Sequence, residues 1–217
     1  MRFRCRAAQW LMATEKPVLD MLGDVVGATG RRYDAKDSAG HGLDTLKIIG
    51  NPAGGYLGVY HTGDIVRLAT SSDLLTWTVS GVLDPQATQP TIVGLPTGGF
   101  LTAVEYNDQA GSGGLVRLRH YPDLDALLAG RHDRRRTVPR TLSRCNEGAL
   151  LPIRTHGGSA AFANPSITAV TSPSGRPAVV LTMFVPGEGA APGEAGELIY
   201  YREIPTQADD PAGREFS

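Results

Sequence analysis

Three carboxylates border apolar segments of the chain and are suited to acid–base chemistry. Asp44 directly precedes TLKIIG, Glu147 lies in CNEGALLPI, and Glu105 follows the apolar run of TAVEYND. A carboxylate beside an apolar segment costs free energy to bury unless a partner compensates it, and a positioned carboxyl group can donate or accept a proton in catalysis. Each site has an alternative: Asp44 can equally cap a turn or strand start, and Glu105 can equally face solvent.

The sequence lacks the motifs of several other site classes. No Ser-His-Asp order, P-loop or dinucleotide fingerprint is present. The two cysteines, Cys5 and Cys145, are too few for a disulfide framework and lack metal-ligand spacing. We therefore predict no metal ligand set and no cofactor.

Charge and hydropathy argue against nucleic acid and membranes as partners of this chain. A net charge of −1 gives no electrostatic reason to expect nucleic acid or a membrane. The one dense basic run, RHDRRR (131–136), lacks interleaved aromatic residues, so we interpret it as a solvated loop rather than a phosphate site. No apolar run approaches the ~20 residues that span a bilayer.

The compartment and the oligomeric state stay open. The basic start MRFRCRAAQWLM is not followed by a long apolar segment, so no signal peptide is expected. Either the protein is intracellular or this chain begins downstream of its natural start.

Two segments repeat one order of residue types. In GGYLGVYHTGDIVRLATSSDLL and GGFLTAVEYNDQAGSGGLVRLRHYPDLDALL, Gly-Gly-aromatic-Leu is followed by Ile/Leu-Val-Arg-Leu and then Asp-Leu. A weaker third copy is GRPAVVLTMFVPGEGAAPGEAGELIYYREI. The offset between copies lies in the range of ~40–50 residues that is typical of propeller blades.

The repeat predicts an all-β protein, a β-propeller of four-stranded antiparallel blades joined by hairpins. We expect DLDALLAG to form one helical turn and Asp73 to cap a turn. RCNEGALLPI and NPSITAV are too close together for a full blade between them. Since a closed propeller usually needs ~4 blades or more, the propeller is either incomplete in this chain or needs a partner. The expected organisation is a lead-in segment at 1–40, the propeller at 41–205 and a disordered tail at 206–217.

The phrase SSDLLTW, Ser71 to Trp77, resembles one that closes a blade in five-bladed β-propeller glycoside hydrolases. These are the family 43 and 62 arabinanases, arabinofuranosidases and xylosidases, with their invertase and levansucrase relatives. The resemblance covers roughly Gly40 to Glu203 and implies a five-bladed lineage. Relatives in this group are often secreted.

The resemblance also implies roles for the carboxylates. In that group an Asp heading the first inner strand is the general base, a Glu heading a third-blade inner strand is the general acid, and an Asp between them orients the acid. Asp44 stands at the first position and Glu147 at the second. At the middle position TQPTIVG offers Gln89 or Thr91 instead of Asp, which leaves Glu105 as the nearest third carboxylate. Inverting enzymes hold acid and base ~6.5–9.5 Å apart.

Four further residues are candidates for binding a carbohydrate. They are His41, His61, Gln89 and Asn164. The histidines either line a sugar pocket, lie beside an ion on the propeller axis, or are structural. Asn164 either bonds a sugar hydroxyl or starts an Asn-Pro turn.

Two functions of different classes follow. The first is a glycoside hydrolase acting on pentose-containing poly- or oligosaccharides by a carboxylate acid/base mechanism. The second is a non-catalytic propeller that binds a carbohydrate or a protein, which the missing middle Asp and the short chain favour. A shortened descendant without activity is a third. Hydrolysis requires two carboxylates that face each other across a pocket.

Overall fold

The computed structural model describes residues 20, 22–24, 26–107, 114–137, 163–184 and 197–205. Contacts divide the chain into two compact units, Met1–Ala35 and Lys36–Ser217. In the first unit, the Gly27 N–H donates to Asp24 and the Arg31 guanidinium donates to the carbonyl of Val26. The strand expected at RCNEGALLPI and the tail at 206–217 lie outside the described residues.

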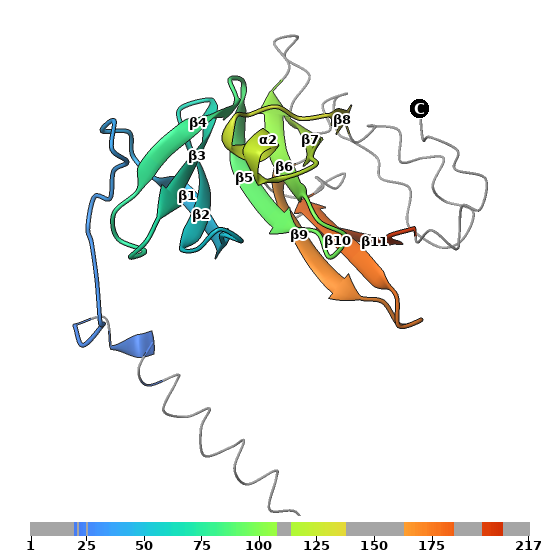
Figure 1. Ribbon diagram of the computed structural model, residues 1–217, viewed down its shortest axis with the longest axis horizontal. Helices are drawn as coiled ribbons and strands as arrows, with labels where there is room; N and C mark the ends of the chain where they lie inside the picture. Colours follow the sequence, from blue (N-terminus) through green and yellow to red (C-terminus); the bar gives the residue numbers. More distant parts are fainter. Residues whose placement is uncertain are drawn as a thin grey trace, which may run out of the picture. The chain divides into compact units, whose positions relative to one another are not determined.

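The second unit begins with a four-stranded antiparallel sheet, in the order β1-β2-β3-β4 (Figure 1). Its strands are β1 (Asp44–Gly50), β2 (Tyr56–Thr62), β3 (Ile65–Ser71) and β4 (Thr78–Asp84). Asp73 caps the turn before β4, because its carboxylate accepts hydrogen bonds from the backbone N–H groups of Leu75 and Thr76. The predicted cap is therefore confirmed. Trp77 is buried, and its indole N–H donates back to the Leu74 carbonyl.

The next sheet repeats this order as β5-β6-β7-β8. Its strands are β5 (Ala87–Gly94), β6 (Phe100–Asn107), β7 (Gly114–Tyr121) and β8 (Arg134–Thr137). The predicted helical turn is α2 (Leu124–Leu128), capped by Asp123, whose carboxylate accepts from the Ala126 N–H at 2.7 Å. The interpretation of 131–136 as a loop is wrong in part, since β8 pairs with β7 and completes the sheet.

The third sheet contains three described strands, in the order β11-β10-β9. They are β9 (Ala163–Thr171), β10 (Pro177–Phe184) and β11 (Glu197–Glu203). The all-β class with antiparallel sheets is confirmed, and so are strands in the weak third copy of the repeat.

The same structural constraint explains the glycine pair in both repeats. Gly55 and Gly99 adopt positive φ angles of 75° and 77°. A Cβ on Gly55 would lie 2.5 Å from the carbonyl oxygen of Ser71, and a Cβ on Gly99 would lie 2.6 Å from that of Tyr121. Only glycine fits the first hairpin so closely against the end of the third strand.

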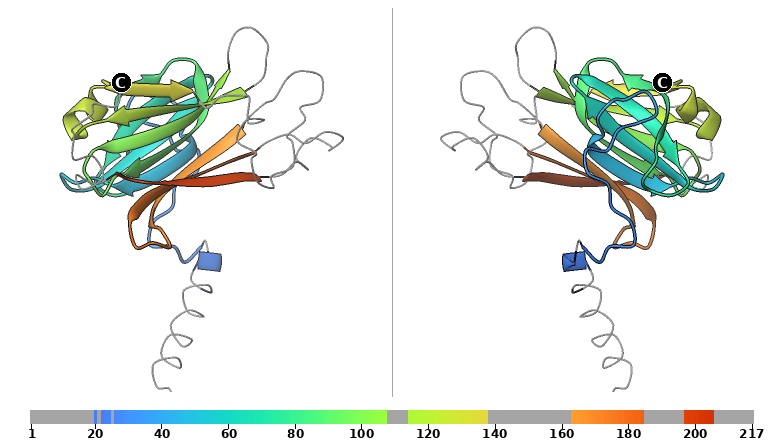
Figure 2. Two further views of the ribbon diagram at one scale, coloured as in Figure 1. Left: turned by 90° about the vertical axis from the view of Figure 1, so that its right-hand side faces the viewer. Right: turned by 90° about the vertical axis from the view of Figure 1, so that its left-hand side faces the viewer.

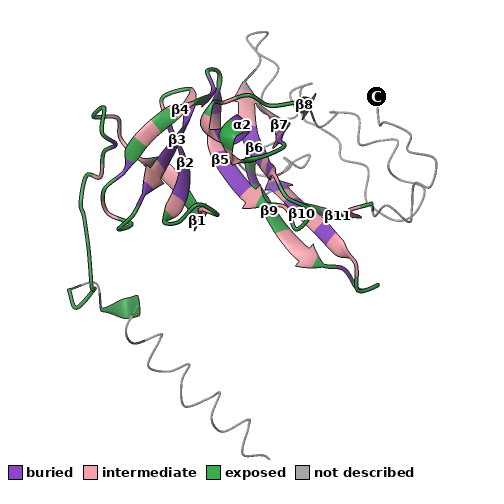
Figure 3. Cartoon of the chain, viewed as in Figure 1, coloured by how far each residue is buried: buried purple, intermediate pink, exposed green. Residues whose placement is uncertain are grey.

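Figure 2 shows the three sheets from two further sides, and Figure 3 shows that buried residues lie on strands of all three. Two apolar clusters join these sheets. The first packs side chains of β2 and β3, among them Leu57 and Val66, against Ile92 and Val104 of the second sheet. The second packs Ala103 and Val116 of the second sheet against Ile167, Leu181 and Met183 of the third. The middle sheet is therefore covered on both faces.

Candidate functional site

The first strand of each sheet begins with the same irregularity. Thr45, Gln89 and Asn164 have φ angles of 51°, 48° and 47°. Residues other than glycine rarely adopt this left-handed conformation, and such strain is concentrated at functional sites. The strand pairing is irregular at the same places, so each sheet has a bulge where its first strand starts.

The residue before each left-handed position pairs with a residue near the end of the second strand. These pairs are Asp44 with His61, Thr88 with Glu105, and Ala163 with Phe184. His61 and Glu105 therefore occupy equivalent positions in successive repeats. The fold brings them together with Asp44 and Asn164, and we call these four residues the strand-head cluster.

His61 is the buried centre of the strand-head cluster. Its Nδ1 lies 2.9 Å from the carbonyl oxygen of Gly63, so Nδ1–H donates there. Its Nε2 lies 3.5 Å from Asp44 Oδ2, is buried, and has no hydrogen-bond partner. In the neutral ring this tautomer leaves Nε2 as an unused acceptor. A buried polar atom without a partner is unusual in proteins.

Glu105 is the half-buried carboxyl of the cluster. Burial raises its pKa above the usual value, although the backbone N–H of Asn164 donates to it and a positive charge on His61, when the ring is protonated, would attract it. Because desolvation outweighs both contacts, Glu105 keeps its proton at a higher pH than an ordinary glutamate. A protonated carboxyl can donate a hydrogen bond or a proton to a ligand.

Asp44 differs from Glu105 in its exposure. Its side chain is 67% exposed, while the neighbouring imidazole of His61 is buried. The cluster thus holds one mostly exposed carboxylate and one half-buried carboxyl, with an imidazole as the shared neighbour. Two carboxyl groups in different environments are the arrangement that separates an acid from a base.

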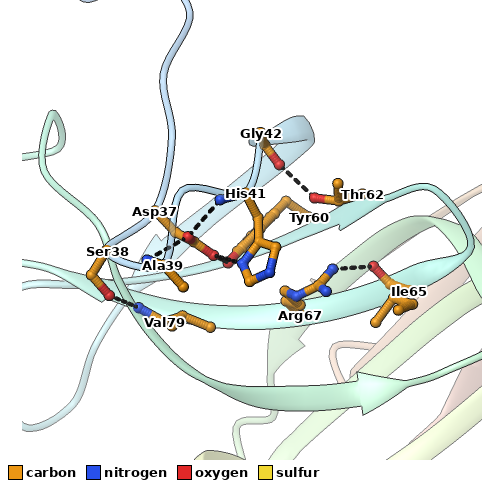
Figure 4. Close-up of polar contacts among 10 residues, drawn as sticks. All are labelled: Asp37, Ser38, Ala39, His41, Gly42, Tyr60, Thr62, Ile65, Arg67 and Val79. Carbon is orange, nitrogen blue, oxygen red and sulfur yellow. Dashed lines mark hydrogen bonds and ion pairs between the residues drawn. The ribbon is translucent and has the colours of Figure 1, made fainter.

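The other predicted site residues are distributed differently. Gln89 lies at the bulge of β5, one residue after the partner of Glu105. Glu147 lies outside the described residues. His41 belongs to a separate cluster on the first sheet (Figure 4).

That second cluster is built around Asp37. Its carboxylate accepts hydrogen bonds from the backbone N–H groups of Ala39 and His41, from His41 Nδ1, and from the hydroxyl of Tyr60. Burial opposes the charge, but these hydrogen bonds lower the pKa of Asp37 to about 2. The contacts hold the segment before β1 against the first sheet. The backbone of Asp37 also forms an isolated parallel β-bridge with that of Trp77. Sequence reasoning missed Asp37, which lies among small polar residues.

A signal for pairing His61 with Glu105 is present in the sequence. Aligning GGYLGVYH with GGFLTAVE places one residue opposite the other, and equivalent positions on adjacent sheets lie at the same end of the fold.

Within the described ranges, no group of three or more His, Cys, Asp or Glu side chains could hold a metal ion. In the same part of the chain, no helix is long and apolar enough to cross a membrane. No protein-family model matches the chain, and no curated protein matches it significantly.

Proposed function

We propose that this chain is a β-propeller of the glycoside hydrolase type that acts on pentose-containing poly- or oligosaccharides by carboxylate acid/base chemistry. The observation that carries the proposal is the strand-head cluster, in which exposed Asp44 and half-buried Glu105 both neighbour His61. The resemblance of SSDLLTW to a blade-closing phrase supports the same lineage.

In the proposed reaction, the protonated carboxyl of Glu105 donates its proton to the leaving glycosidic oxygen as the bond to the anomeric carbon breaks. Asp44 takes a proton from the attacking water, whose oxygen forms the new bond to that carbon. His61 lies beside both groups and positions Asp44, whose Oδ2 is 3.5 Å from its Nε2. Glu147 is the alternative acid, on the resemblance alone.

Hydrolysis of aryl pentosides, arabinan and xylan tests this proposal. The wild type is expected to release product, and Asp44→Asn, Glu105→Gln and Glu147→Gln identify which carboxyls are required. Asp64→Asn is the matched control, because Asp64 is an exposed carboxylate outside the cluster. If folded wild type releases nothing from any substrate, the hydrolase proposal is wrong.

A non-catalytic carbohydrate-binding propeller is the second candidate. The head of the second sheet's first strand carries Thr88 and Gln89, which cannot ionise, where a hydrolase of this type has an Asp. In that case titration calorimetry shows oligosaccharide binding that His61→Ala weakens, without hydrolysis.

A further inference from the structure

A third polar cluster, distinct from the strand-head cluster and from the Asp37 cluster, lies between the first and second sheets. Nη1 of Arg117 and Nη2 of Arg119, both on β7, each lie 2.8 Å from the same oxygen, Oδ2 of Asp84, at the end of β4. All three residues are more than nine-tenths buried. The other oxygen of Asp84 accepts from the backbone N–H of Gln86. Two buried cations therefore share one carboxylate, which leaves an excess positive charge.

In the part of the chain that the structure describes, the surroundings do not remove this excess charge. The ring of Tyr106 stacks 3.4 Å from the Arg117 guanidinium and stabilises that cation in part. On the other side, Arg135 of β8 pairs directly with Arg119 and adds a like charge. The carboxylate of Asp133, which directly precedes β8, is bound to His120 at 2.7 Å.

The titration behaviour of the neighbours agrees with an uncompensated positive charge. Burial lowers the pKa of Arg119, and Asp84 only partly opposes this effect. Burial also lowers the pKa of His132, and the charges of Arg119 and Arg135 lower it further.

The same cluster contains buried donors without partners. The Nε atoms of Arg117 and Arg119 are buried and make no hydrogen bond. The hydroxyls of Tyr121 and Thr102 are neighbours on the same face, yet neither makes a hydrogen bond of good geometry. Arginine Nε can only donate. A water molecule would satisfy such donors but leave the charge, whereas an anion would satisfy the donors and balance the charge.

We propose that a small monoanion, with chloride as the simplest case, binds between the first and second sheets at Arg117 and Arg119. The anion would complete the packing of these sheets, because it neutralises the one buried charge that Asp84 leaves over. This inference does not depend on the hydrolase proposal.

Thermal unfolding of the wild-type protein tests the site. Chloride replaces gluconate, which is too large to enter, at constant ionic strength and pH. Because a ligand that binds only the folded state stabilises it by mass action, Tm is expected to rise with chloride and then saturate. A Tm that is independent of chloride overturns the proposal.

Two arginine variants test whether the chloride dependence of Tm arises at this site. Arg119→Met leaves a neutral Arg117–Asp84 pair and is expected to abolish the chloride dependence. Arg202→Met removes an exposed arginine of β11 and is expected to retain it. If Arg119→Met fails to fold, the quadrupolar NMR line width of chloride decides the question on the wild type alone. Broadening by the folded protein that nitrate displaces supports the site, and its absence contradicts it.

Discussion

At the scale of the residue, the environment decides what each carboxyl can do. Glu105 and Asp44 both belong to the strand-head cluster, yet Glu105 is half-buried while Asp44 is mostly exposed. The pKa of Glu105 is raised, so the folded state favours its neutral form. This favourable contribution is fully present below the unfolded pKa and is lost as pH rises through the folded pKa.

Substitution of Glu105 by glutamine tests the direction in which this contribution to stability changes with pH. Gln keeps the shape and a hydrogen-bond donor but cannot ionise, so Glu105→Gln is expected to gain stability relative to wild type as pH rises from about 4 to about 8. The measurement is Tm of both proteins across that range, with Asp64→Asn as the control. A difference in Tm that does not change with pH would show that Glu105 is not buried in this way.

At the scale of the element, close packing fixes how the first sheet is covered. Gly58 lies in β2 beneath the indole of Trp77, and a Cβ there would lie 2.6 Å from Trp77 Cζ3 and 2.8 Å from Leu46 Cδ1. The residue that ends the SSDLLTW phrase therefore needs a glycine on β2, where its ring packs. Its aromatic ring covers the sheet, and its N–H is satisfied within its own turn.

Gly58→Ala is therefore expected to destabilise the protein by ~1–3 kcal/mol, the usual cost of overpacking a filled core. Gly50→Ala is the matched control, because Gly50 ends β1 and a Cβ added there would meet no atom within 4 Å. Urea unfolding measures both variants. Equal midpoints for the two would mean that Trp77 does not pack on Gly58 as described.

At the scale of the whole molecule, polar contacts complement the apolar clusters that join the sheets. Asp84 connects the end of β4 to two cations of β7. Its loss would leave both guanidiniums buried without a counter-charge, and breaking a buried ion pair typically costs ~3–5 kcal/mol.

Asp84→Asn is expected to show a loss of that size in urea unfolding, measured in gluconate so that chloride cannot compensate. Asp64→Asn, at the exposed turn between β2 and β3, is expected to change the free energy of unfolding by less than ~0.5 kcal/mol. If both variants behave alike, Asp84 does not hold the two sheets together.

Sequence reasoning predicted the elements better than the contacts between them. Strands β1 to β7 were predicted from local signals, namely glycine pairs and β-branched runs, and the helix α2 was predicted as one turn at DLDALLAG. Strand β8 was missed because consecutive arginines carry no β signal, and pairing with β7 determines it. The Asp84 contacts were missed because their partners are distant in the sequence, and only packing brings them together. The propeller itself stays a prediction.

The leaving-group dependence of hydrolysis tests the central claim most directly. An enzyme without its general acid still cleaves substrates whose leaving group needs no proton. Glu105→Gln is therefore expected to lose most activity on xylobiose or arabinobiose and little on the dinitrophenyl pentoside, while Asp44→Asn loses both. Equal loss on the two substrates in Glu105→Gln, or full activity in either variant, would contradict the roles assigned to the strand-head cluster.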